Sequence, residues 1–128
     1  MSSVVTAKYV LIATGGRPSD PEIPGGREHS INSDDIFWLK ANPGRTLVVG
    51  ASYIALECGG FMHALGVDVT IMVRSILLRG FDQQIANKIG EYMASMGTKF
   101  INQAVPISIS LNSEGRKVVV YKQGEDEI

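Results

Sequence analysis

The sequence has few of the residues from which redox and metal centres are built. Cysteine occurs once, as Cys58, among 128 residues. A single thiol excludes an internal disulfide, a paired-thiol redox centre and a cysteine-based metal cluster within this chain. We expect Cys58 to behave as a small, buried apolar residue.

The sequence also lacks a charge excess and a long apolar run. Its formal net charge of −1 argues against a general nucleic-acid or membrane-surface role. The longest stretches without a charge, 46–56 and 100–113, are shorter than the roughly 18 apolar residues of a membrane helix. No basic start precedes the first apolar run, so we expect no secretory signal and a cytoplasmic protein, or its mitochondrial counterpart.

What the chain contains is the pattern of an alternating α/β domain. Apolar residues make up 45% and charged residues 20%, which is typical of a folded domain. We expect strands over 8–16, 45–50, 67–73 and 98–102, helices over 51–65 and 83–96, a short helix within 31–40 capped by Ser33 or Asp34, and an antiparallel hairpin of 105–111 and 116–122. The predicted fold is therefore α/β, a Rossmann-like parallel sheet with crossover helices and a small antiparallel β annex.

Periodicity also predicts the apolar faces of the two longer helices, which should pack on the core. They consist of Ile54, Cys58, Phe61, Met62 and Leu65 in the first helix, and of Ile85, Ile89, Tyr92, Met93 and Met96 in the second. Asp82 is expected to cap the second helix, and Gly66 and Gly97 to end the two helices.

A glycine-containing turn joins the strand over 45–50 to the next helix. Gly50 fits the tight turn of the G-x-G-x-x-G/A dinucleotide fingerprint, and Ala55 fits the small residue that lets helix and strand pack closely. Ser52 replaces the second glycine, but its hydroxyl is small and is able to donate to a phosphate. By itself such a turn is equally well explained by tight packing. The βαβ context favours a nucleotide pyrophosphate at the helix N-terminus.

The end of the following strand carries arginines instead of a ribose-binding carboxylate. Asp68 lies 18 residues after Gly50, but it precedes the strand, whereas a ribose is met at the strand's far end. That end is followed by Arg74, Ser75 and Arg79. Arginines in a loop are usually solvated surface charges; at this position they match the 2′-phosphate of NADP, and we therefore predict a preference for NADPH over NADH.

Several segments together resemble one known family. "ATGGRP", "SDDIF", "PGRTLVVGASYIALE" and "VRSILLRGFDQQ" are similar to the NADPH-binding region of the large, FAD-containing thioredoxin reductases and of the thioredoxin glutathione reductases, within the pyridine nucleotide-disulfide oxidoreductase superfamily. The resemblance covers about Lys8 to Ile101. Glutathione reductases, which are also similar, usually keep glycine where Ser52 stands.

The resemblance implies a role for each candidate residue. Gly50, Ser52 and Ile54 would lie along the pyrophosphate, and Arg74, Ser75 and Arg79 would hold the 2′-phosphate of NADPH. Tyr53 would cover the nicotinamide pocket and Glu57 would lie near the nicotinamide amide; otherwise, Tyr53 is a packed helix-surface tyrosine and Glu57 a solvated charge. Thr14 and Gly15 would lie at the edge of the FAD site in the parent.

The resemblance further implies that residues 1–20 are the strand and linker of the FAD-domain boundary. Residues 21–128 would be an NADPH-binding domain that stops before its return strand, which would leave a sheet edge open to self-association. The parent would pass electrons from NADPH through FAD and a disulfide to thioredoxin, with FAD and dimerisation domains as its other parts. The fragment is expected to be inactive alone. The alternatives are a non-catalytic NADP-binding module and the NADPH domain of a related glutathione reductase.

Overall fold

A computed structural model describes residues 2–124 and 126–128 of the chain. The parallel sheet contains β1 (Thr46–Val49), β2 (Val69–Val73) and β3 (Lys99–Asn102), in the order β1-β2-β3. Helices α2 (Tyr53–Ala64) and α3 (Gln83–Ser95) connect these strands. The remaining elements are α1 (Gly26–His29), the 3-10 helix η1 (Ile36–Trp38), and an antiparallel sheet of β4 (Ala104–Leu111), β5 (Lys117–Gln123) and β6 (Asp126–Glu127).

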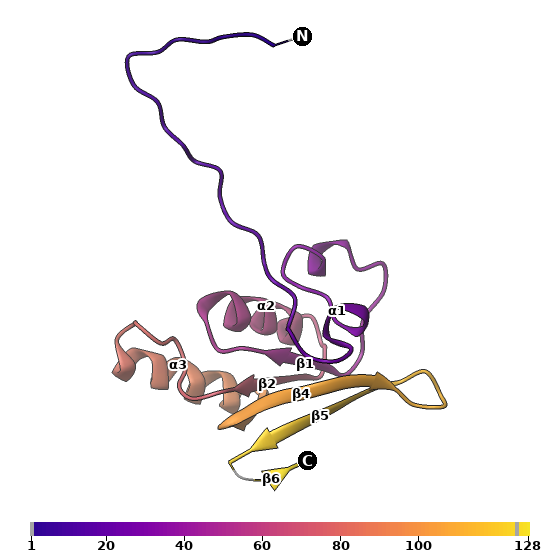
Figure 1. The fold of residues 1–128 in the computed structure, drawn as a ribbon. Helices are drawn as coiled ribbons and strands as arrows, with labels where there is room; N and C mark the ends of the chain where they lie inside the picture. Colours follow the sequence, from indigo (N-terminus) through magenta and orange to yellow (C-terminus); the bar gives the residue numbers. More distant parts are fainter. Residues whose placement is uncertain (1, 125) are drawn as a thin grey trace.

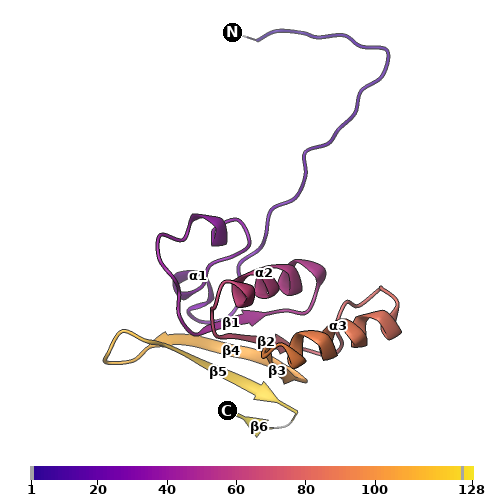
Figure 2. The ribbon, with the colours of Figure 1, turned by 180° about the vertical axis from the view of Figure 1, so that it is seen from behind.

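The body of the molecule has three layers (Figure 1). Helices α2 and α3 cover one face of the parallel sheet, and β4 and β5 lie on its other side, as the view from behind also shows (Figure 2). Thr46 pairs with Val69 and Val73 pairs with Asn102, so all three parallel strands end at the same edge. This arrangement confirms the predicted Rossmann-like fold with its antiparallel annex, to which β6 adds a third strand that the sequence did not predict.

The central strand β2 forms most of the core because it is buried on both faces. Val69, Ile71 and Val73 are almost fully buried and pack in one cluster with Leu56 and Met62 of α2. Met72 points to the opposite face, is only 1% exposed, and lies outside that cluster. A continuous run of β-branched and apolar residues is the expected signature of a parallel strand covered by two layers.

The faces that the two long helices bury differ from the predicted ones. In α2, Met62 is buried and Phe61 packs against the core cluster, as predicted. The other buried residues are Leu56 and Gly59, and Ile54 is 43% and Leu65 76% exposed. In α3 the buried residues are Ala86 and Gly90. The predicted apolar residues Ile85, Ile89, Tyr92 and Met96 are exposed, and only Met93 packs against the core cluster. Small residues allow both helices to lie close to the sheet and the neighbouring loop, and this close approach outweighs the hydrophobic pattern.

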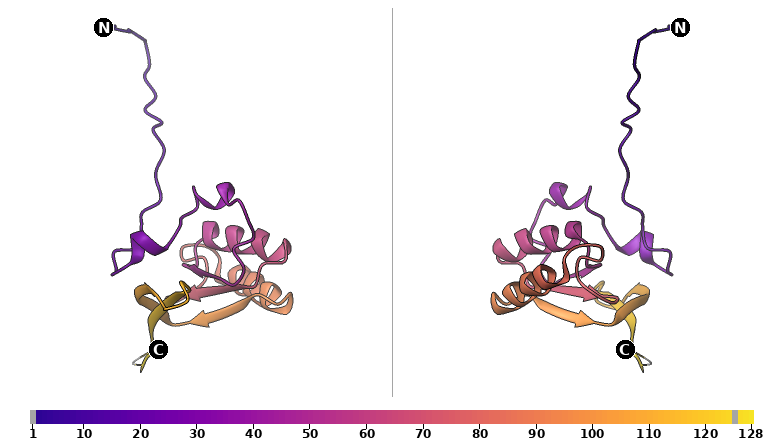
Figure 3. Two further views of the ribbon diagram at one scale, coloured as in Figure 1. Left: turned by 90° about the vertical axis from the view of Figure 1, so that its right-hand side faces the viewer. Right: turned by 90° about the vertical axis from the view of Figure 1, so that its left-hand side faces the viewer.

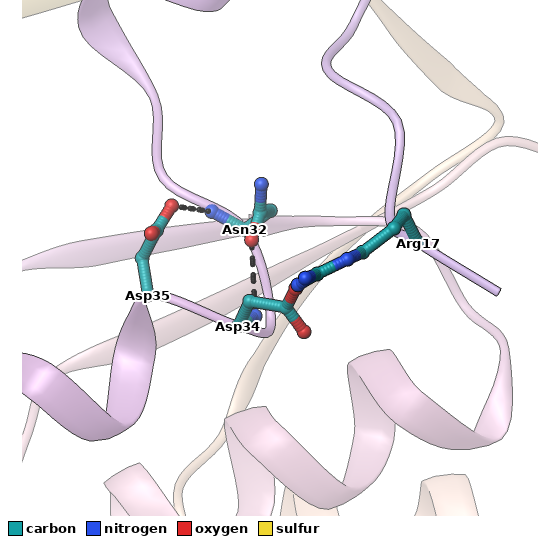
Figure 4. Close-up of polar contacts among 4 residues, drawn as sticks. All are labelled: Arg17, Asn32, Asp34 and Asp35. Atoms are coloured by element: carbon teal, nitrogen blue, oxygen red, sulfur yellow. Dashed lines mark hydrogen bonds and ion pairs between the residues drawn. The ribbon is translucent and has the colours of Figure 1, made fainter. Parts of the chain in front are cut away.

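A polar network folds the linker between the N-terminal residues and β1 (Figure 4). Asn32 Oδ1 accepts from the backbone N–H of Asp34 at 3.0 Å, Asp35 accepts from the N–H of Asn32 at 3.2 Å, and Arg17 Nη1 lies 2.8 Å from Asp34 Oδ2. These short side chains bond the backbone locally and so compete with helix formation. The predicted helix within 31–40 is therefore only the three-residue η1, which follows Asp35, and neither Ser33 nor Asp34 caps it.

Residues 2–16 form an extended arm that leaves the body of the molecule (Figure 3). The predicted strand over 8–16 is wrong for this chain, because none of these residues pairs with another strand. Tyr9, Val10, Leu11 and Ile12 are each at least 80% exposed. A strand needs a neighbouring backbone, and the arm has none.

The three remaining sequence predictions for helix ends are confirmed. Asp82 Oδ1 accepts from the N–H of Ile85 at 2.9 Å, while Gly66 and Gly97 have φ angles of 86° and 104°. Within the described residues, no helix is long and apolar enough to cross a membrane.

Candidate functional site

The glycine turn lies where β1 reaches the common edge at which the parallel strands end. The N–H of Gly50 donates to Met72 O at 3.0 Å, which fixes the turn beside the end of β2. Gly50 has φ 128°, a conformation that residues with a Cβ rarely adopt. A Cβ added there would meet only the Cβ of Ala55, at an ordinary 3.6 Å. Backbone conformation, and not lack of space, therefore requires glycine at this position.

Helix α2 begins directly after this turn with its polar groups free for a ligand. Ser52 is the N-cap residue, with extended backbone angles, but its side chain makes no capping hydrogen bond. The first N–H groups of a helix have no partner within it. Ser52 and the exposed residues Tyr53 and Ile54 thus surround a helix N-terminus that favours negative charge.

Helix α2 packs closely on the sheet at Gly59, a residue that the sequence analysis missed. A Cβ at Gly59 would lie 3.2 Å from Ile71 Cδ1 and 3.5 Å from Val69 Cγ1. Ala55, the residue expected to fill this role, lies one turn nearer the glycine turn and is half-buried. The glycine pair Gly59-Gly60 in the helix interior could have indicated this close contact. Glycine in a helix interior lowers helix stability, so its presence there suggests a packing role.

The arginine loop, residues 74–82, connects the end of β2 to α3. Arg74, Ser75 and Arg79 are all exposed, and Arg79 Nη2 donates to Ser75 Oγ at 2.6 Å. Because the hydroxyl accepts this bond, its own hydrogen remains available to a ligand. Between Val73 and Arg79 the sequence contains no acid.

Two contacts attach the arginine loop to the glycine turn. The N–H of Leu78 donates to Ala51 O at 2.8 Å, and the rings of Tyr53 and Phe81 meet edge to face with centroids 6.4 Å apart. Leu78 is only 8% exposed and belongs to the core cluster. Two sequence-distant candidate groups, the turn with its helix N-terminus and the arginine loop, are therefore brought to one edge of the sheet.

Asp68, the carboxylate considered for a ribose, lies at the opposite edge. Its carbonyl accepts from the N–H of Thr46, at the start of β1, and its side chain forms a 2.7 Å ion pair with Lys99. A hydrogen bond from Lys99 is the largest influence on this carboxyl group and lowers its pKa, as do the charges of Lys99, Arg45 and His63. Asp68 is thus excluded from the glycine-turn edge, as the sequence analysis expected.

The other candidate residues are more dispersed. Glu57 is exposed on α2, one turn after Tyr53, and its charge adds to burial in raising the pKa of the neighbouring Cys58 thiol. Cys58 is half-buried and unpaired, in partial agreement with the expected buried residue. Thr14 and Gly15 belong to the exposed arm, so the structure does not bring them to the glycine turn.

The three layers, the glycine turn at the strand ends and the helix N-terminus beside it define an α/β domain of the Rossmann type. The family model described as "Pyridine nucleotide-disulphide oxidoreductase" matches residues 2–128. The chain therefore belongs to the pyridine nucleotide-disulphide oxidoreductase family, which confirms the resemblance seen in the sequence at the level of the family.

Curated proteins that are similar to this chain include thioredoxin reductases. The chain is 52% identical over 124 residues to "Thioredoxin reductase SEP1" of Emiliania huxleyi, which covers 97% of this chain and 25% of that protein. It is 61% identical over 103 residues to "Thioredoxin reductase" of Plasmodium falciparum (isolate FCH-5), covering 80% of this chain and 19% of that protein. The chain thus spans a quarter or less of these relatives.

Proposed function

We propose that this chain is the NADPH-binding segment of a flavoprotein disulfide reductase of the thioredoxin reductase type. The observation that carries the proposal is the arginine loop at the end of β2. Arg74, Ser75 and Arg79 are exposed there, no acid competes with them before Asp82, and the Leu78–Ala51 hydrogen bond holds the loop beside the glycine turn.

The residues present fit a dinucleotide that carries a 2′-phosphate. Gly50, Ser52 and Ile54 would receive the pyrophosphate at the N-terminus of α2, where free N–H groups and the helix dipole favour an anion. The two guanidinium groups and the Ser75 hydroxyl offer charge-assisted and neutral hydrogen bonds to the 2′-phosphate. Tyr53 would cover the nicotinamide, and Glu57 would lie near its amide; in this structure the Tyr53 ring rests against Phe81.

For the flavin, the described residues offer only the exposed arm with Thr14 and Gly15, which do not form a binding site by themselves. We assign FAD to further domains of the parent, with these two residues at the edge of its site. When bound, NADPH would supply a hydride to the flavin. The reduced flavin would reduce a disulfide of the parent, and the resulting pair of thiols would reduce thioredoxin. With one cysteine, this chain alone is expected not to turn over. We propose the cytoplasm, or its mitochondrial counterpart, as the parent's compartment.

The test compares binding of NADP⁺ and NAD⁺ by calorimetry at matched ionic strength. In an Arg74→Ala, Arg79→Ala variant, we expect the Kd for NADP⁺ to rise about a hundredfold or more, because two charge-assisted hydrogen bonds are lost and each contributes roughly 1.5–3 kcal/mol. The Kd for NAD⁺ should change little, since NAD⁺ has no 2′-phosphate.

An Arg27→Ala, Arg116→Ala variant is the matched control, because it removes the same charge from exposed positions away from this loop. Equal affinities of the unsubstituted chain for the two nucleotides would contradict the NADPH assignment. If the control variant loses the same affinity for NADP⁺, the effect of removing Arg74 and Arg79 is due to net charge alone.

A further inference from the structure

Gln83, the first residue of α3, turns its side chain back onto the arginine loop. Its Nε2 lies 3.3 Å from Leu77 O, 3.2 Å from Leu78 O and 3.1 Å from Phe81 O. A side-chain amide has two N–H hydrogens, so the three carbonyl groups share them. One side chain therefore donates hydrogen bonds to three backbone carbonyl groups of the arginine loop.

The loop needs such a donor because its backbone is irregular. Leu78 is a non-glycine residue with φ 45°, and the N–H of Phe81 closes a tight turn onto Leu78 O at 2.9 Å. A left-handed leucine persists only where its surroundings hold it. Without the Gln83 amide, Leu77 O and Phe81 O would each lose this donor, while Leu78 O would still accept from the N–H of Phe81.

The start of α3 does not depend on this side chain. Asp82 supplies the capping acceptor through its bond from the N–H of Ile85, at 2.9 Å. Gln83 is half-buried, whereas its neighbour Gln84 is exposed and makes none of the side-chain hydrogen bonds found in the described part of the chain. Helix capping and loop attachment are thus separate tasks of adjacent residues.

We infer that Gln83 is a positioning residue that sets the nucleotide preference of this site. The inference rests on the proposed function. The Gln83 amide holds the loop in the conformation in which Arg79 bonds Ser75 and Leu78 bonds Ala51, so Arg79 is placed before a ligand arrives. Without it the loop would have to be ordered by the ligand, which costs affinity. Only a ligand with a 2′-phosphate binds the arginines. Loss of the Gln83 amide should therefore lower the affinity for NADP⁺ and not for NAD⁺.

The experiment uses Gln83→Met, which keeps the length of the side chain and removes its donors, and Gln84→Met as the matched control. Calorimetry with the whole chain measures the Kd for NADP⁺ and for NAD⁺. For Gln83→Met we expect the NADP⁺ Kd to rise roughly fivefold, the factor that corresponds to one hydrogen bond of ordinary strength. The NAD⁺ Kd should stay the same, and Gln84→Met should change neither.

Two results would overturn the inference. Unchanged Kd values for both nucleotides in Gln83→Met would show that the loop does not need the amide. Equal losses for both nucleotides would show a general structural role. If the Arg74→Ala, Arg79→Ala variant loses the preference while Gln83→Met keeps it, the proposed function stands and only this inference fails; if the arginine variant itself keeps the preference, the proposed function fails first.

A second measurement requires no substitution and so does not depend on the folding of a variant. In the unsubstituted chain, NMR should show slower hydrogen exchange for the Gln83 side-chain amide than for that of Gln84, because only the former is hydrogen-bonded to the loop. Equal exchange rates would contradict the contacts on which the inference is built.

Discussion

At the scale of single residues, Asp68 shows how a charge is used at the edge away from the glycine turn. Its ion pair with Lys99 lowers its pKa, so the folded state gains stability above the unfolded pKa of about 4 and loses it as the pH falls through the lower folded value. We expect Asp68→Asn to lower the urea midpoint at pH 7, with the difference from the unsubstituted chain shrinking as the pH falls below about 4. The effect should be small, because both partners are well exposed.

A double-mutant cycle with Lys99→Met separates this pair from the other charges near Asp68. Coupling that is present at pH 7 and decreases as the pH falls below about 4 is the expected outcome. A difference between Asp68→Asn and the unsubstituted chain that is independent of pH would mean that the ion pair is not its source.

Residue-scale predictions from the sequence succeeded where one local rule determines the outcome. Gly50, Gly66 and Asp82 were identified because a left-handed turn, a helix end and a helix cap each require few residue types. Leu78 and Gln83 were not identified, because their roles depend on contacts across the arginine loop that no periodicity reports.

At the scale of elements, the two long helices begin with N-cap residues that serve different purposes. Asp82 caps α3 through its side chain, whereas the side chain of Ser52 makes no capping bond in α2. We expect Asp82→Ala to lower the free energy of unfolding by about 1 kcal/mol, the usual value of a capping bond. Ser52→Ala should leave stability nearly unchanged and weaken binding of both nucleotides, since both carry the pyrophosphate.

Urea unfolding and calorimetry on the two variants measure these opposite outcomes. A large loss of stability in Ser52→Ala would show that the hydroxyl caps the helix after all. Unchanged nucleotide affinity in that variant would remove Ser52 from the proposed pyrophosphate site.

The elements themselves were largely predictable, but the faces they bury were not. Strands β1 to β3 and helices α2 and α3 follow from apolar runs, helical spacing and turn residues. Burial of Ala86 and Gly90 in place of Ile85 and Ile89 does not, because hydrophobicity ranks side chains without regard to how closely a backbone must approach. A Cβ at Gly90 would lie only 2.4 Å from Leu77 Cδ1, so a larger residue there would require the Leu77 side chain to move.

At the scale of the whole molecule, the arm and the body are nearly independent. Every residue from 2 to 16 is exposed, and the first side-chain contact with the body is the Arg17–Asp34 ion pair. The sequence predicted a strand in the arm because its apolar residues are typical of one. A strand also needs a partner, which the body does not provide, so the same apolar residues remain in contact with water.

Removing residues 1–16 should therefore reduce self-association without reducing stability. We expect a chain beginning at Arg17 to keep its Tm, because the deleted residues add nothing to the core, and to be closer to monomeric by size-exclusion chromatography with light scattering. A full-length Val10→Asp, Ile12→Asp variant is the control, since it keeps the length of the arm and removes much of its apolar character.

If that variant also becomes monomeric, exposed apolar side chains of the arm drive association. If both altered chains remain dimeric, the arm is not responsible, and the exposed stripe of Ile85, Ile89, Tyr92 and Met96 on α3 becomes the surface to test next.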